Sequence, residues 1–304
     1  MLVLEKSDSL TSMFQRCLIC TDFSDGLHRL VHFVPSLARS GIQQIVFLHS
    51  VPLWEEGGVP RIDEEKVEQA KARLSPALEN VPEGIEVQIE LPCGRPLDTI
   101  PRILEKYQFD AILTGTPIRS LLQEKLFGST SVALAKITST PLLIFRPQLI
   151  STYTREELEL RCQHLGRYLL IPYNDSQAAK YLVEQIKSYA QNRPENSLQQ
   201  CMLIWVVDDS MRRGMPIEHR LQKATEKLEA VKVELEQLDL QVNTEVRQGN
   251  AILEILEAAI EFDISAIAIA SDNRNTLLEW TAPSFANDIL RKSWFPMLFF
   301  SPKK

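Results

Sequence analysis

The chain has 304 residues, enough for about two domains of ordinary size. Its hydrophobic fraction of 44% and charged fraction of 24% are typical of a soluble globular protein, and no apolar run approaches the roughly 20 residues of a membrane helix. The net charge of −7 is spread along the chain, which disfavours nucleic-acid binding because that needs a basic surface.

The first half of the chain alternates short apolar strands with helices after a leader of residues 1–13. Pro35 lies inside the first helical pattern and predicts a kink there. A loop with Gly57 and Gly58 leads into a charged helix. The strands are expected at residues 17–21, 45–48, 87–91, 111–114 and 142–145, and the helices at 27–38, 63–78, 97–107 and 129–137.

The second half repeats this order, with strands expected at residues 168–171, 202–207, 242–246, 266–270 and 297–300. Strands that alternate with helices predict right-handed βαβ units and a parallel sheet. We therefore expect an α/β protein with two tandem Rossmann-like domains, each a five-stranded parallel sheet with helices on both faces. The expected divisions are residues 14–147 for domain one, 148–164 for a linker with a charged helix, and 165–304 for domain two.

The two halves differ in their glycines. Gly115 and Gly128 of the first half become Ala270 and Pro283 in the second, each 155 positions later. Glycine allows backbone N–H groups to turn toward a phosphate. At most the first half therefore keeps a phosphate-binding loop.

The five cysteines and the lack of a recognisable export signal favour free thiols and a cytoplasmic location. Cys17 and Cys20 match a C-x-x-C pattern but lie on an expected strand. Residues three apart on a strand point to opposite faces, so we expect both to pack in the core rather than share a disulfide or a metal.

Ligands of such sheets bind beyond the carboxyl ends of the strands. The polar and glycine residues found there in the first half are the candidates for ligand contacts. They are Asp22 and Ser24 after the first strand, His49, Ser50 and Val51 after the second, Cys93 and Gly94 after the third, and Gly115 to Ser120, including Arg119, after the fourth. Gly128, Ser129 and Thr130 open the next helix, whose N-terminus would suit an anion.

Each candidate also has a purely structural explanation. Asp22 precedes a helix and suits a capping position, as do Ser129 and Thr130. Arg119 is equally explained as a solvated loop charge. His49 has no partner motif and is better explained by the core or its rim than by catalysis.

The loop after the fourth strand resembles the nucleotide loop of the universal stress protein family, G-x2-G-x9-G-[ST]. In this chain the loop runs from Gly115 through Ile118 to Gly128 and Ser129. The spacing is complete, and only the middle glycine is replaced. As in the family, a helix and a proline-led apolar strand follow.

Three further motifs carry the same resemblance in chain order. Asp22 and Ser24 match the Asp-x-Ser that ends the family's first strand. His49-Ser50-Val51 loosely matches a His-Val-type segment, and Gly94-Arg95-Pro96 matches a G-x-P turn. The resemblance covers residues of about 14–147 and 165–302, and it implies a tandem protein with the adenine nucleotide alpha hydrolase-like fold.

The resemblance also implies a ligand, ATP or a related adenine nucleotide, with Mg²⁺ as its companion ion. The counterpart of Asp22 contacts the adenine–ribose end, and Ser50 or Val51 would meet adenine through the backbone. Gly94 belongs to the same edge. The residues implied around the ribose and phosphates are Gly115, Arg119, Gly128, Ser129 and Thr130.

Two departures from the family pattern matter. Ile118 places a β-branched side chain where glycine permits close backbone approach. In domain two Asn174 replaces the Asp, Asn273 stands in the loop, and Pro283 removes an N–H donor at the helix start. We expect domain two to be a degenerate copy.

The sequence therefore supports two functions. One is regulatory nucleotide binding by domain one, and the alternative is a nucleotide-free stress-response scaffold that presents a surface to an unknown protein partner. At most slow ATP hydrolysis is expected, because the chain has no Walker-type motif. The apolar last strands of the two domains are expected to pair with each other inside one chain, and the full chain is a candidate homodimer.

Overall fold

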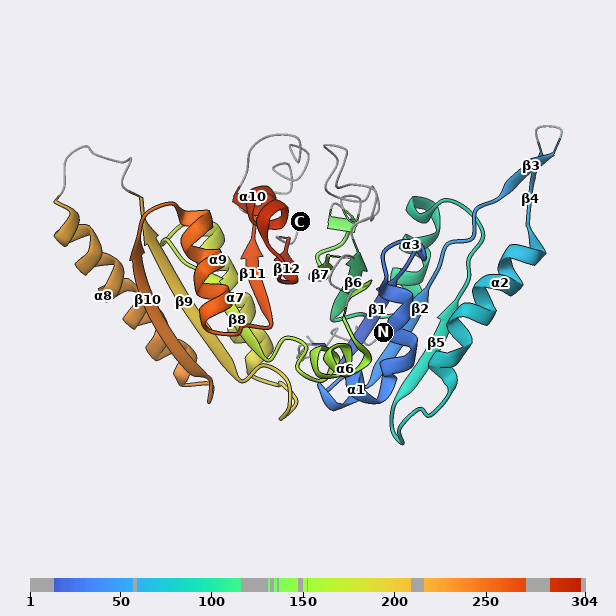
Figure 1. Ribbon diagram of the computed structural model, residues 1–304, viewed down its shortest axis with the longest axis horizontal. Helices are drawn as coiled ribbons and strands as arrows, with labels where there is room; N and C mark the ends of the chain where they lie inside the picture. Colours follow the sequence, from blue (N-terminus) through green and yellow to red (C-terminus); the bar gives the residue numbers. More distant parts are fainter. Residues whose placement is uncertain are drawn as a thin grey trace, which may run out of the picture.

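A single sheet runs through both halves of the computed structural model (Figure 1). The structure describes residues 14–56, 59–115, 131, 134–135, 137–146, 150–151, 153–208, 216–271 and 285–301. Within these residues, ten strands follow each other across the sheet in the order β10-β9-β8-β11-β12-β7-β6-β1-β2-β5.

Each half contributes five parallel strands in equivalent order, as expected from the sequence. The first half supplies β1 Arg16–Cys20, β2 Gln44–Leu48, β5 Glu86–Glu90, β6 Ala111–Gly115 and β7 Leu142–Phe145. The second supplies β8 Tyr168–Pro172, β9 Gln200–Val207, β10 Gln241–Gln248, β11 Ala266–Ala270 and β12 Met297–Phe300.

The two halves join through their last strands. β7 and β12 pair antiparallel, with Leu143 opposite Leu298 at the centre of the register. Both side chains are almost completely buried, and each such leucine contributes about 1.5–3 kcal/mol by leaving water. The pairing predicted from the sequence is observed, and it covers two apolar strands that would otherwise be exposed edges.

Helices cover both faces of the sheet (Figure 1). One face packs against η1 Leu27–Phe33, α1 Val34–Arg39, α2 Glu64–Leu74, η2 Ser75–Leu78, α6 Arg155–Gln163, α7 Gln177–Ala190 and α8 Ile217–Glu236. The other face packs against α3 Pro96–Lys106, α9 Ala251–Glu261 and α10 Phe285–Lys292. The expected linker helix is α6, which begins with a capping box of Thr154 and Glu157.

The two cysteines of the C-x-x-C pattern lie on opposite faces of β1. Cys17 belongs to the core on the α6 side and Cys20 to the core on the α3 side. Both are free and buried, and burial raises the pKa of each thiol. The sequence-based expectation of two packing residues is confirmed.

Two local expectations were wrong. The helix expected at residues 27–38 is a 3-10 helix, η1, followed by a short α-helix, α1. Pro35 lies in the first turn of α1, where its missing N–H costs nothing, so the proline begins a new helix instead of kinking an old one. The loop expected before α2 contains an antiparallel hairpin of β3 Trp54–Glu56 and β4 Val59–Arg61, which projects from the sheet (Figure 1).

Candidate functional site

The chain leaves β1 in a tight polar turn. Oδ1 of Asp22 accepts hydrogen bonds from the backbone N–H of Ser24 at 2.8 Å and from Ser24 Oγ at 2.7 Å. Both side chains are exposed. Asp22 lies two residues beyond Cys20, and Ser50 lies two residues beyond Leu48, the β2 partner of Cys20. The structure therefore brings Asp22, Ser24 and Ser50 to one edge of the sheet.

The same turn contains a buried acid that the sequence reasoning missed. Asp25 is 4% exposed, and its Oδ1 accepts hydrogen bonds from Thr21 Oγ1 at 2.8 Å and from the N–H of Leu27 at 2.9 Å. Burial, followed by the charge of Asp22, raises the pKa of Asp25 to about 6. The buried carboxyl group of Asp25 and the exposed carboxyl group of Asp22 thus both hold this turn in place.

Gly115 is the last residue of β6, and it packs against the side chain of Asp25. A Cβ on Gly115 would lie 2.5 Å from Asp25 Cβ, closer than real Cβ atoms approach their neighbours. The glycine is therefore required by packing, whatever its role toward a phosphate. The second half changes both residues together, to Gln177 and Ala270, and this paired change is the sequence signal that could have identified Asp25.

An aromatic stack follows on the side of β2. Phe23 has a left-handed backbone, with φ of 65°, and its ring centroid lies 4.2 Å from that of His49. The guanidinium of Arg73, from α2, lies 4.8 Å from the same ring. Nδ1 of His49 donates to the carbonyl of Thr21 at 2.9 Å, and burial lowers the pKa of the imidazole. His49 thus braces the turn in its neutral form, in agreement with the structural explanation.

Ser50 and Val51 differ in what they offer a ligand. The N–H of Val51 donates to the carbonyl of Pro92 at 2.9 Å, and its carbonyl accepts from the N–H of Gly94 at 2.8 Å. Within the described part of the chain, no backbone group pairs with the N–H or carbonyl of Ser50. Because successive residues of an extended chain present their backbone groups to opposite sides, Ser50 is the better placed of the two to meet a ligand.

The turn after β5 is fixed by a glycine and a buried threonine. Gly94 has φ of 135°, a conformation that other residues rarely adopt. Thr99 Oγ1 lies 2.7 Å from Ser50 Oγ and also donates to the carbonyl of Arg95 at 3.2 Å. The start of α3 is thereby tied to the end of β2.

The phosphate end of the predicted site lies outside the described residues. This applies to Arg119, Gly128, Ser129 and Thr130, and also to Ile118. The next described residue, Ser131, is fully buried, and its Oγ lies 2.9 Å from Thr114 Oγ1 on β6. This contact holds the chain after Thr130 against the strand that ends at Gly115.

Domain two repeats the first turn with different chemistry. Oδ1 of Asn174 accepts from the N–H of Ser176 at 3.2 Å, as Asp22 accepts from Ser24. Asp175 has φ of 60° in the place of Phe23 and forms ion pairs with Lys180 at 2.9 Å and Lys227 at 3.3 Å. The turn geometry is kept, but an ion pair with α8 replaces the stack with α2.

A cavity of about 310 Å³ lies at the carboxyl ends of the domain-two strands. Its lining is mainly apolar and includes Leu182, Ile204, Val206, Ile255 and Phe285. In contrast to the turn of Asp22 and Asp25, the cavity wall carries no Asp, Glu, His, Lys or Arg among the described residues. This crevice suits an apolar occupant better than a phosphate.

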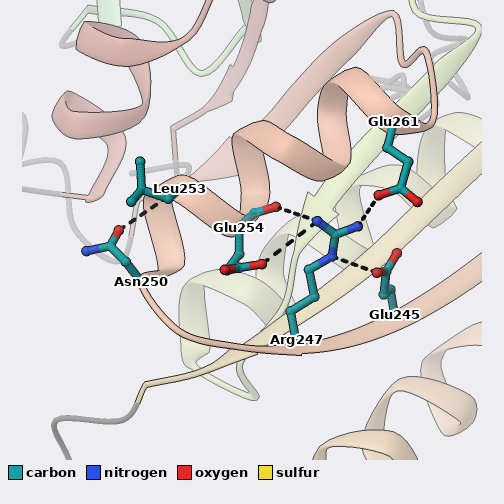
Figure 2. A network of polar contacts seen from close by, with 6 residues as sticks. All are labelled: Glu245, Arg247, Asn250, Leu253, Glu254 and Glu261. Atoms are coloured by element: carbon teal, nitrogen blue, oxygen red, sulfur yellow. Dashed lines mark hydrogen bonds and ion pairs between the residues drawn. The ribbon is translucent and has the colours of Figure 1, made fainter.

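The turn after β10 is also kept, but its charges are paired (Figure 2). Gly249 has φ of 140°, close to that of Gly94, and Asn250 caps α9. Arg247 bonds Glu245 at 2.6 Å and Glu261 at 2.5 Å, and Glu254 lies 3.9 Å away. The hydrogen bond to Glu245, followed by that to Glu261, raises the pKa of Arg247. The guanidinium of Arg247 is thus committed to carboxylates of its own domain and is not free to receive an anionic ligand.

The repeated sheet, the shared turns and the joined last strands agree with one sequence family. The family model described as "Universal stress protein family" matches residues 13–146 and 167–301. The chain belongs to the universal stress protein family. It is a tandem member, with one copy of the family domain in each half.

Solved structures support the same fold. A universal stress protein from Archaeoglobus fulgidus covers 95% of this chain and 98% of its own, with a TM-score of 0.63 and 16% identity. A protein from Pseudomonas aeruginosa described as a putative universal stress protein covers 95% of this chain and 94% of its own, with a TM-score of 0.53 and 13% identity.

A third universal stress protein was crystallised in complex with cAMP. It covers 45% of this chain and 98% of its own, with a TM-score of 0.34 and 10% identity. No curated protein matches the chain. None of the described helices is both long enough and apolar enough to cross a membrane.

Proposed function

We propose that domain one is a regulatory site for ATP or a related adenine nucleotide, and that domain two is a degenerate copy that completes the sheet. The observation that carries this proposal is the edge formed by Asp22, Ser24 and Ser50. There an exposed, ordered carboxylate lies beside the backbone of Ser50, which has no backbone partner among the described residues. Family membership adds a second, independent support.

In this proposal, Asp22 contacts the adenine–ribose end and the backbone of Ser50 meets adenine. Gly115, Arg119, Gly128, Ser129 and Thr130 surround the ribose and phosphates, and Gly94 shapes the edge beside Ser50. Among the described residues, no group of three His, Cys, Asp or Glu side chains is arranged to hold a metal.

Domain two supports the asymmetry of the proposal. Asp175 is committed to two lysines, and the crevice beside it is apolar. The glycine–acid pair of Gly115 and Asp25 is absent there. A homodimer of the full chain, a protein partner and a cytoplasmic location remain predictions.

Calorimetric titration of the full chain with ATP and MgCl₂ tests the proposal. Asp22→Ala should weaken ATP binding about tenfold, the effect of one lost charge-assisted contact. Asn174→Ala, at the equivalent turn of domain two, is the matched control and should leave the affinity unchanged. Absence of binding heat in the unmodified protein would instead support the scaffold function. Equal losses in the two variants would contradict the assignment of the site to domain one.

A further inference from the structure

A second cavity lies where the linker helix meets domain two. It has a volume of about 620 Å³ and is bounded by α6, by the residue that follows β7, and by the residues that precede β8, β11 and β12. We call it the linker cavity. It shares no residue with the predicted nucleotide site, and it adjoins the amino ends of the domain-two strands, whereas the nucleotide crevice of the fold lies at carboxyl ends.

The wall of the linker cavity contains a buried cation without a counter-ion. Arg146 is only 9% exposed. Its Nη2 donates to the carbonyls of Leu290 and Arg291 at the end of α10. Its Nε has no hydrogen-bond partner, and no carboxylate of the described residues forms an ion pair with it. Buried charges are normally paired, and the described part of the chain supplies no anion to this guanidinium.

The other charged groups of the wall are two arginines and two acids. Arg161 and Arg167 join Arg146, whereas Glu157 and Asp263 are the acids. Glu157 is engaged in the capping box, where it accepts from the N–H of Thr154 at 2.8 Å. With Arg146, the wall holds three arginines and two acids, an excess of one positive charge in a chain whose net charge is −7. An excess of positive charge in a concave surface attracts anions.

Aromatic side chains form the rest of the wall. Tyr153 lies under the guanidinium of Arg161, at 5.4 Å from its ring centroid. Trp294 also lines the linker cavity and is 61% exposed, an unusual position for so large an apolar side chain. Phe145, Tyr168 and Phe262 complete this part of the wall.

We propose that the linker cavity binds a small organic anion, with a planar apolar body and a carboxylate or phosphate group. Arg146 and Arg161 receive the anionic group, and Tyr153 and Trp294 receive the planar body. The volume is within the range of about 300–1,000 Å³ that is typical of small-molecule sites. The ligand would contact both the end of domain one and the start of domain two. Its binding would therefore depend on how the linker positions the two domains.

Fluorescence titration of the full chain with anilinonaphthalene sulfonate (ANS), a planar aromatic anion, tests this proposal. ANS should bind at micromolar concentrations, and uncharged N-phenylnaphthylamine should bind at least about tenfold more weakly, because it lacks the anionic group. Arg161→Gln should weaken ANS binding about tenfold. Arg155→Gln, an exposed arginine on the same helix that does not line the cavity, is the matched control and should change the affinity less than about twofold.

Circular dichroism should show that both variants keep the wild-type helix content, since both side chains are exposed. Displacement of ANS by phenyl phosphate or by benzoate would support the site and distinguish the two anionic groups. The proposal is overturned if ANS does not bind, if neither competitor displaces it, if the two variants bind it equally, or if the uncharged probe binds as tightly.

Discussion

The contact between Gly115 and Asp25 leads to a sharp prediction about stability. Gly115→Ala would place a Cβ 2.5 Å from Asp25 Cβ and 3.1 Å from Asp25 Cγ. An ordinary contact needs about 1 Å more, and overpacking of this kind costs about 1–3 kcal/mol. No left-handed backbone angle adds to the strain, so a gain of about 0.4–1 kcal/mol from the stiffer unfolded chain offsets part of the cost. We expect a net loss of about 1–2 kcal/mol.

Urea unfolding of the full chain, followed by far-ultraviolet circular dichroism, measures this loss as a lower midpoint. Ala270→Gly at the equivalent position of domain two is the matched control. It removes a Cβ instead of adding one, and should cost only about 0.5–1 kcal/mol through backbone entropy. The two domains share one sheet, so we expect them to unfold in a single transition. The midpoints can be compared only if the dependence of the unfolding free energy on urea concentration is the same in all variants.

A double-mutant cycle identifies the cause. Asp25→Gly removes the Cβ that the added methyl group would meet, so Gly115→Ala should cost at least about 1 kcal/mol less in that background than in the unmodified chain. Additive effects of the two substitutions would refute the reasoning, because they would show that the two positions do not interact.

Two further predictions concern the same half of the chain. The pKa of Asp25 is raised from 3.8 to about 6 in the folded protein. Its ionised form is therefore disfavoured by folding, and the stability should fall by up to about 3 kcal/mol as the pH rises from about 4 to about 6. Asp25→Asn, which keeps an oxygen for Thr21 and Leu27, should flatten this part of a plot of urea midpoint against pH; an unchanged slope would mean that another group titrates. Separately, residues 14–147 expressed alone should dimerise through β7, whose partner β12 is then missing. A monomer in light scattering would contradict this expectation.

The architecture was predictable because its signals are local and repeated. Period-two alternation placed Cys17 and Cys20 on opposite faces, and two proline-led apolar strands that needed covering predicted the pairing of β7 with β12. The hairpin of β3 and β4 was missed because Gly57 and Gly58 indicated a loop, and its strand β4 contains Pro60. In an isolated two-stranded hairpin both strands are edges, where the missing N–H of proline is tolerated.

The candidate site was predictable only in part. Asp22 and Ser24 were recognisable by spacing, and the structure places them together. Asp25 was missed because a buried acid one residue beyond a matched motif leaves no periodic signal. The linker cavity could not have been predicted, because Arg146 and Arg161 lie 15 residues apart and line one cavity only through the placement of α6 beside the residues that precede β8, β11 and β12.

The two copies show how one backbone accommodates two chemistries. Phe23 and Asp175 both have a left-handed backbone at the equivalent position of the turn. Each contacts a cation from the equivalent helix of its domain, Arg73 of α2 in domain one and Lys227 of α8 in domain two. An aromatic ring and a carboxylate both attract a cation, so the turn has the same geometry with Phe23 in domain one and with Asp175 in domain two. The crevice beside the turn of domain two is lined mainly by apolar side chains. Joining the domains covers both apolar edges, so the second copy contributes to the fold whether or not it binds a nucleotide. Among the described helices, α6 has no counterpart in the second half, and the linker cavity therefore depends on the fusion of the two domains rather than on either copy.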